Sequence, residues 1–186
     1  MDENRAIIEQ YRPICLLCNV SKVLEKIIFD ELYDIVKIKI DESQHGFRKH
    51  RSVITQLLLF LDLLYNEIDE KENELFVLHL DFKKAFDSVP HDLLLQKIED
   101  EGIGGNVLKI IASYLSNHKQ YVKVNNSVSE TVPVTSGVPQ GSLLGSLLFI
   151  IYVNDLPKQM NECKAFGYAD DFKLVFAKPE SFLKTL

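Results

Sequence analysis

The chain is poor in sulfur and has no tryptophan: its 186 residues include three cysteines and two methionines. An odd number of cysteines, without an apolar leader at the N-terminus, is not the disulfide framework of a small secreted domain. We therefore expect free thiols and an intracellular location, in the nucleus, the cytoplasm or both. Zinc binding is disfavoured as well, because Cys15 and Cys18 have no second pair of ligands at the spacing of zinc sites.

Long apolar runs and an excess of positive charge are also missing. The longest apolar run, Leu143 to Val153, is interrupted by Gly145 and Ser146 and falls far short of the roughly 20 residues that cross a bilayer. No membrane role is expected. The formal net charge of −6 argues against a protein that coats nucleic acid through charge alone, although Arg48 to Arg51 is a compact basic run.

The chain does have enough apolar residues, 46%, for one large domain or two small lobes, without repeats or flexible linkers. Apolar residues recur at helical spacing in five segments: 22–39, with Ser21 as its N-cap, 53–68, 92–101, 106–115 and 142–154. Strand patterns cover 75–80, a hairpin over 120–125 and 128–134, and a second hairpin over 163–176. These elements predict an α+β fold in which helices back an antiparallel sheet.

Acidic residues stand at two strand ends. Asp81 follows the apolar run Leu75 to Leu80, and Asp170 and Asp171 lie at the tip of the second hairpin. If these ends meet, each pair of carboxylates about 4 Å apart repels by about 4 kcal/mol at an effective dielectric of about 20. A pair of Mg²⁺ ions relieves this repulsion and clamps the attacking and leaving oxygens of a phosphoryl transfer. Taken alone, Asp81 is more simply a surface acid.

Five segments together resemble a known family. Tyr11–Leu17, Gln44–Ser52, Asp81–Leu95, Thr135–Pro157 and Tyr168–Asp171 are similar, in order, to motifs of the reverse transcriptases of non-LTR (LINE-type) retrotransposons. A lone Tyr-x-Asp-Asp is weak evidence, whereas five motifs in family order within one chain are strong evidence. The resemblance implies RNA-directed DNA polymerisation with an RNA template, a DNA primer and deoxynucleoside triphosphates as partners.

The resemblance also implies a division of the chain. It is that of a right-hand polymerase with fingers over 1–70, palm over 71–89, a fingers–palm connection over 90–139 and further palm over 140–186. A thumb, which follows in the family, is expected to be absent from these residues. Gln44 to Arg48 is expected to be a turn, in which Gly46 allows a positive φ.

The implied site has two parts. Asp81, Asp170 and Asp171, with the backbone carbonyl of Phe82, would hold two Mg²⁺ ions, for which Mn²⁺ can substitute. The implied nucleotide-binding residues are Arg12, Arg48, Phe82, Phe86, Gln140, Gly141 and Tyr168. Among these, Arg48 would hold triphosphate oxygens, Gln140 would touch the sugar-phosphate, and Phe86 would exclude a 2′-hydroxyl.

Two alternatives stay open at this point. The chain could be a non-catalytic palm-like module that binds nucleic acid or protein partners, or a two-metal phosphohydrolase. A phosphohydrolase would have similar carboxylates but no need of a pocket formed by Phe86 and Gln140.

Overall fold

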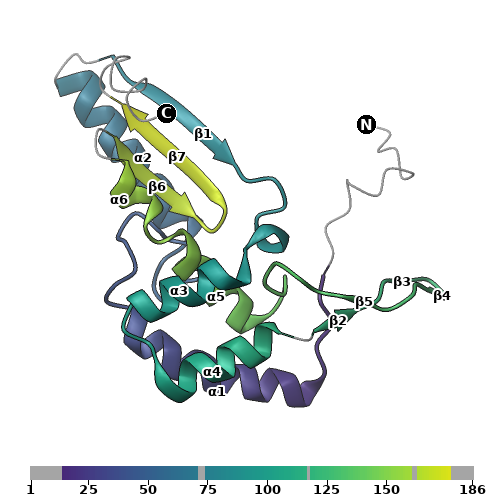
Figure 1. Cartoon of the computed structure of the whole chain (residues 1–186). Coiled ribbons are helices and arrows are strands. Elements are labelled where there is room, and N and C mark those ends of the chain that lie inside the picture. The colour runs from purple at the N-terminus through teal and green to yellow at the C-terminus, as the bar shows by residue number, and fades with distance from the viewer. Residues whose placement is uncertain (1–13, 71–73, 117, 161–162, 177–186) are drawn as a thin grey trace.

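The computed structural model describes residues 14–70, 74–116, 118–160 and 163–176. A three-stranded sheet with one long helix beside it forms one end of the molecule, and a group of helices forms the other (Figure 1). The helices are α1 (Asn19–Val36), α2 (Val53–Tyr65), α3 (His91–Asp100), α4 (Gly105–Leu115), α5 (Leu143–Val153) and α6 (Leu156–Gln159), with a π-helical turn η2 (Asn66–Glu70) and a 3₁₀ turn η3 (Phe86–Ser88). The predicted mixture of helices with antiparallel strands is confirmed.

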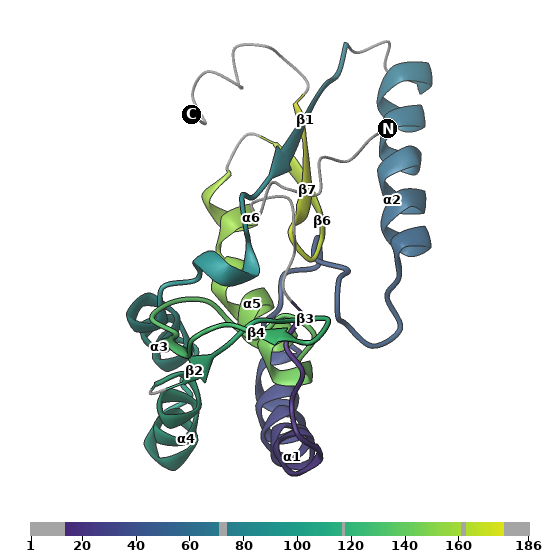
Figure 2. The ribbon, with the colours of Figure 1, turned by 90° about the vertical axis from the view of Figure 1, so that its right-hand side faces the viewer.

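The sheet contains β1 (Phe76–Asp81), β7 (Asp171–Phe176) and β6 (Lys164–Tyr168), in that order, with both pairs antiparallel. Side chains alternate between the two faces of each strand. Phe172, Leu174 and Phe176 are buried on one face. The opposite face lies toward α2, which runs beside the sheet in Figure 2. The predicted strand and second hairpin are therefore confirmed.

The main core is built around α5. Leu144, Leu148 and Ile150 of this helix are fully buried, and α5 packs against both α1 and α3. A helix that is apolar on every side belongs inside a core. The sheet joins this core through Phe172, so the helical group and the sheet share one packed interior.

Two helix starts test the sequence analysis. Ser52 caps α2 with both bonds of a capping box, which confirms the predicted start at Val53. For α1, the predicted N-cap Ser21 is wrong, because the helix begins at Asn19 and ends at Val36. The Ser21 hydroxyl lies within the first turn, 3.2 Å from the Cys18 thiol, so it is not available as the cap of that helix.

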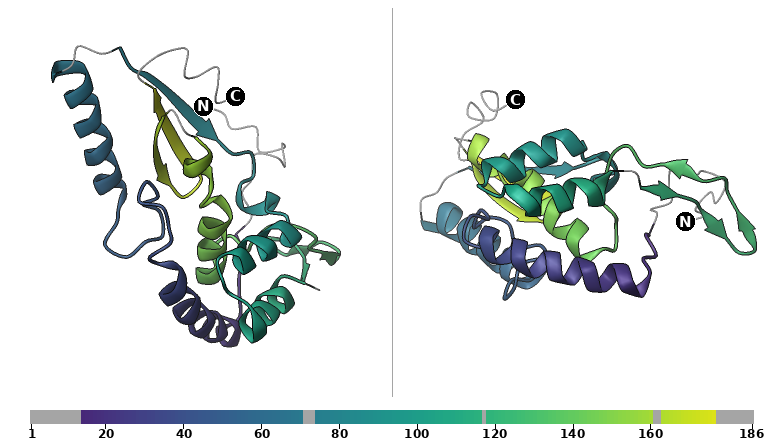
Figure 3. Two further views of the ribbon diagram at one scale, coloured as in Figure 1. Left: turned by 60° about the vertical axis from the view of Figure 1, so that its left-hand side comes forward. Right: turned by 60° about the horizontal axis from the view of Figure 1, so that its bottom comes forward.

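A narrow two-stranded ribbon projects from the helical group, as Figure 3 shows. It consists of β2 (Lys119–Gln120) paired with β5 (Val132–Pro133), and β3 (Lys123–Val124) paired with β4 (Ser127–Val128). Asn125, at its turn, has a φ of 54°, a conformation that asparagine tolerates. The predicted hairpin is confirmed, although its pairing is interrupted.

No helix within the described ranges has the length and apolar character needed to cross a bilayer.

Candidate active site

Asp81 and Asp171 face each other across the β1–β7 pair. Asp81 is the last residue of β1, Asp171 is the first of β7, and they are direct partners in the register. Directly opposite residues lie on the same face of a sheet, with Cβ atoms about 4.5–5.5 Å apart. Tyr168 is the partner of Asp171 on β6, so all three residues share one face at one end of the sheet.

Asp170 lies in the two-residue turn between β6 and β7, next to this pair. Its companion in the turn is Ala169, which has a φ of 57° and is buried. Asp170 is half-buried, whereas Asp81 and Asp171 are exposed. The structure thus brings the three predicted acids to one end of the sheet, with only Asp170 in the turn itself.

A loop from the N-terminal half of the chain packs against this turn, and the sequence analysis missed its role. The Gln44 side chain bonds both backbone groups of Ala169, and an isolated parallel bridge joins Gln44 to Gly167. Gly46 does not use the positive φ that glycine allows; in this loop positive φ occurs at Phe47 and His50. Glycine is needed at position 46 because a Cβ there would lie 2.2 Å from the Ala169 nitrogen.

The face that carries the acids continues beneath α2. Lys173, two residues after Asp171 and on the same face, lies with its Nζ 5.0 Å from the centre of the Phe60 ring of α2. Phe60 also packs edge-on against Phe166 of β6. The acids are therefore left at the uncovered end of a face that α2 covers farther along.

Phe86 lies in the 3₁₀ turn that follows β1. Its ring stacks on Phe149 of α5 with centroids 4.5 Å apart, and it also makes an edge-to-face contact with the exposed Phe47. Phe82, one residue after Asp81, packs edge-on against Phe172. Phe86 is therefore held by rigid aromatic contacts rather than free to swing.

The loop before α5, over residues 135–141, is held against the Phe86 turn. The amides of Gly137 and Val138 donate to the carbonyls of Val89 and Phe86, and His91 Nε2 lies 2.8 Å from the Gly137 carbonyl oxygen. Gly137 has a φ of 91°, and a Cβ there would lie 2.8 Å from the Asp87 Cα. Two constraints, conformation and space, thus require glycine at this position.

The predicted contacts Gln140 and Gly141 lie at the end of this loop. The Gln140 carbonyl accepts a hydrogen bond from the Cys15 amide at 2.9 Å, so the N-terminal segment runs beside the loop. Gly141 has a φ of 94° and is exposed. The Gln140 side chain is half-buried.

A buried hydroxyl–carboxylate cluster holds the start of α5. Ser142 caps the helix by accepting from the Gly145 amide, and its hydroxyl also donates to Glu25 of α1 at 3.0 Å. Tyr114 of α4 donates to the same Glu25 oxygen. Burial, together with the Glu25 carboxylate, raises the pKa of Tyr114 well above its usual range. Three helices therefore meet at the base of the loop.

Arg48 is predicted to hold phosphate oxygens, and its guanidinium is partly engaged within its own loop. Nη1 donates to the carbonyls of Asp41 and Gln44 at 2.8 and 3.1 Å. Nη2 lies 3.4 Å from the Glu42 carboxylate, whose side chain is 77% exposed. Arg12, the other predicted basic contact, lies outside the described residues.

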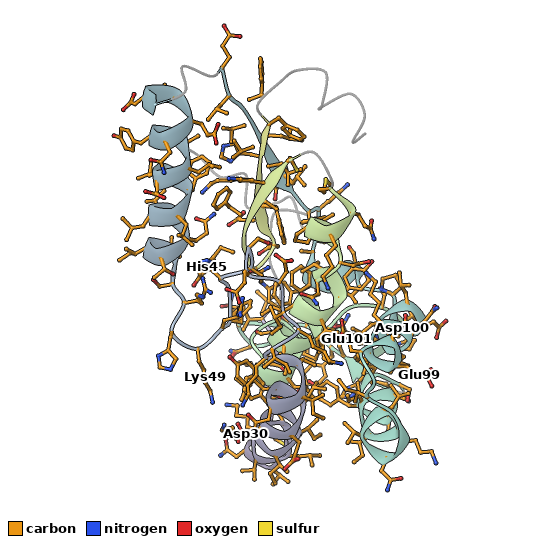
Figure 4. All side chains as sticks on the ribbon, turned by 90° about the vertical axis from the view of Figure 1, so that its left-hand side faces the viewer. Asp30, His45, Lys49, Glu99, Asp100 and Glu101 are labelled. Atoms are coloured by element: carbon orange, nitrogen blue, oxygen red, sulfur yellow. The ribbon has the colours of Figure 1, made fainter. Side chains whose placement is uncertain are left out.

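His45 joins the same loop to the start of α2, where Figure 4 labels it. Arg51 can only donate, so the His45 Nε2, 3.0 Å away, accepts and its Nδ1 donates to the Thr55 hydroxyl. Burial and then the charges of Arg51 and Arg48 lower the pKa of His45. The hydrogen bonds and the lowered pKa therefore both favour the neutral form of His45.

The three acids are of the chemical type that binds a divalent cation, but their side chains are not arranged around a common metal position. Mg²⁺ prefers carboxylate oxygens, and the register pairs two carboxylates with a third next to them. Among the described residues, however, no group of three acidic, histidine or cysteine side chains is arranged to hold a metal ion. A metal would therefore require these side chains to move.

Comparison with known proteins agrees with the motifs. The family described as reverse transcriptase (RNA-dependent DNA polymerase) matches residues 3–186. The chain is 34% identical over 180 residues to a probable RNA-directed DNA polymerase from transposon BS of Drosophila melanogaster, covering 91% of this chain and 19% of that protein. It is 31% identical to the polymerase of the mobile element jockey from the same species, covering 95% and 20%. The chain thus spans about a fifth of these relatives.

Solved structures share the fold. Apo telomerase from Candida tropicalis superposes with a TM-score of 0.64 at 14% identity, over 88% of this chain and 35% of that one. Telomerase from Candida albicans gives 0.63 at 17% identity, over 89% and 32%. Motif order, fold and the match along nearly the whole length lead to one conclusion: the chain belongs to the reverse transcriptase family.

Proposed function

We propose that this chain is the catalytic part of an RNA-directed DNA polymerase of the non-LTR retrotransposon type. The observation that carries the proposal is the register that sets Asp81 opposite Asp171, beside Asp170, in a chain of this family. Its substrates are an RNA template, a DNA primer and deoxynucleoside triphosphates. These substrates occur inside the cell, in the nucleus and the cytoplasm, where we expect the protein to act.

Two divalent cations, Mg²⁺ or in its place Mn²⁺, supply positive charge to the primer 3′-hydroxyl and the triphosphate when bound. Asp81, Asp170 and Asp171, with the carbonyl of Phe82, are the proposed ligands. The contribution of the chain is to keep these oxygens together on a rigid sheet, since phosphoryl transfer depends mainly on positioning and charge.

The nucleotide is proposed to lie between the acids and the loop before α5. Phe86, backed by Phe149, forms a firm wall beneath the sugar, with Tyr168, Gln140 and Gly141 nearby on the proposed path. Arg48 is proposed to reach the triphosphate through Nη2, which would exchange the exposed Glu42 carboxylate for phosphate oxygens. Arg12 is proposed as a further contact.

In the terms of a right-hand polymerase, we assign 1–70 to the fingers, 71–89 and 140–186 to the palm, and 90–139 to the connection between them. The three-stranded sheet, with α5 beneath it, supports the palm assignment.

The test is primer extension on poly(rA)/oligo(dT), with the chain alone and within its natural reading frame. Template-dependent incorporation of dTTP, dependent on Mg²⁺ or Mn²⁺, is expected. Binding of primer–template without incorporation in either form would favour the alternative, a palm-like module that only binds nucleic acid.

A further inference from the structure

We infer that Gln44 is a positioning residue for the catalytic turn: its side chain, together with Gly46, fixes the backbone of Ala169 and so sets Asp170 against Asp81. The inference rests on the proposed function of these acids. It adds to the site a residue that lies 125 positions before Ala169 and bonds the backbone of the turn.

The side-chain carboxamide of Gln44 bonds both the backbone N–H and the backbone carbonyl of Ala169. Its Nε2 donates to the Ala169 carbonyl at 3.1 Å, and its Oε1 accepts from the Ala169 amide at 2.9 Å. The same oxygen accepts from the Gly46 amide at 2.8 Å, which holds the side chain in place. Gln44 is only 3% exposed, so water does not compete for these bonds.

Ala169 needs such support. Its φ of 57° is disfavoured for a residue with a Cβ, and no glycine relieves it. Asp170 follows directly, so any relaxation of Ala169 toward an ordinary conformation would rotate the Asp170 carboxylate away from its position. The carboxamide of Gln44 matches the amide and carbonyl of the strained residue at once, which neither an apolar side chain nor a carboxylate can do.

The loop that carries Gln44 is itself anchored. The Gly167 amide donates to the Ser43 carbonyl at 2.9 Å and the His45 amide donates to the Gly167 carbonyl at 2.8 Å, so the loop adds to the edge of β6. The Arg48 Nη1 donates to the backbone carbonyl of Gln44. Gly46 lies so close to Ala169 that a Cβ would displace the turn. The turn is thus fixed by a rigid surface rather than by a mobile side chain.

The experiment compares Gln44→Met, which keeps the volume and removes the bonds, with Gln56→Met as the matched control. Gln56 is equally buried and lies against Lys173 of β7, but it does not touch the turn. Gln44→Glu is the third variant. A protonated glutamic acid can still donate to the Ala169 carbonyl, whereas an ionised one cannot. Asp170→Asn tests the proposed function separately.

The first measurement is amide hydrogen exchange on the 186-residue chain without ligands. Gln44→Met should accelerate exchange at Ala169 by roughly tenfold or more, since its acceptor is lost, while Gly167, bonded to Ser43, stays protected. Gln56→Met should leave both unchanged. Unchanged protection of Ala169 in a folded Gln44→Met protein would overturn the inference.

The second measurement is primer extension by the polymerase that carries the chain. Gln44→Met should lower kcat roughly 10- to 100-fold and raise the Mg²⁺ concentration for half-maximal rate, with KM for primer–template unchanged. For Gln44→Glu, the rate relative to wild type should fall as pH rises and the new carboxyl ionises. If Asp170→Asn abolishes extension while Gln44→Met behaves as Gln56→Met, the positioning role is refuted. If Asp170→Asn stays active, the proposed function fails, and the exchange result still decides the contact.

Discussion

Asp81 and Asp170 are the residues on which the proposed chemistry depends most. We expect Asp81→Asn and Asp170→Asn each to reduce extension to background, because each change removes a charged ligand from a two-metal site. Asp171→Asn should be milder, since we propose that Asp170 carries more of the coordination. The measurement is single-nucleotide incorporation, with circular dichroism as the check on folding. Near-normal rates in folded Asp81→Asn or Asp170→Asn protein would refute the metal assignment.

Phe86 is the residue on which sugar choice is expected to depend. Its stacking on Phe149 gives the rigid wall that exclusion of a single hydroxyl requires, since a loose apolar pocket rejects an added hydroxyl only about 10²-fold. Phe86→Val should therefore raise the kcat/KM for a ribonucleotide relative to a deoxyribonucleotide. Phe60→Val, which removes a ring packed on Phe166 under α2, is the matched control. An unchanged ratio with lower stability would make Phe86 a core residue.

Single functional residues can be predicted from the sequence when their neighbours along the chain mark them. Asp81 is recognisable because an apolar run of strand length delivers it to the sheet end. The contact between Gln44 and Ala169 leaves no local signal, because the two residues are 125 positions apart. The requirement for Gly46 is likewise visible only in space: its neighbour Ala169 belongs to the other end of the chain.

The start of α5 is an element whose stability can be tested. Ser142→Ala removes both a helix cap and a donor to the buried Glu25, so we expect a loss of about 1–3 kcal/mol in the free energy of unfolding. Ser52→Ala removes the cap of α2 without touching a buried carboxylate and should cost less. Urea unfolding measures both. Equal losses would show that the Glu25 contact adds nothing.

The loop that precedes α2 is expected to make stability depend on pH through His45. Its folded-state pKa is lower than the ordinary value of 6.5, so the unfolded chain takes up a proton first as pH falls. The contribution is fully present above about pH 6.5 and is lost as pH falls through the folded-state pKa. Urea midpoints between about pH 7.5 and about pH 5 should fall less in His45→Gln than in wild type. Equal slopes would contradict this role.

Element boundaries follow the strength of their local signals. The start of α2 is predictable because Ser52 and Thr55 form a complete capping box, and α5 is predictable because apolar residues fill it and Ser142 precedes it. The start of α1 is not predictable, because its N-cap residue, Cys18, makes no capping hydrogen bond through its side chain. Where this helix begins depends instead on the packing of its buried face against α5. Pairing of β1 with β7 rather than with β6 also lies beyond local pattern.

The molecule as a whole carries the wrong sign of charge for tight binding to nucleic acid. With a net charge of −6, the 186 residues alone should bind an RNA–DNA hybrid with a Kd on the order of 10⁻⁶ M or weaker, and added salt should weaken binding further. Fluorescence anisotropy with a labelled hybrid at several salt concentrations measures this. Nanomolar affinity that survives raised salt would contradict it, whereas strong binding by a longer polypeptide would not.

The order of the sheet, β1-β7-β6, has a consequence for biosynthesis. Its central strand, β7, begins about 90 residues after the end of β1 and also follows β6, so β1 has no partner in this sheet until β7 has been made. Pairings between distant segments form slowly. The acids proposed to bind metal can therefore come together only after β7 has been made, about 90 residues after β1, so the order of synthesis delays assembly of this end of the sheet.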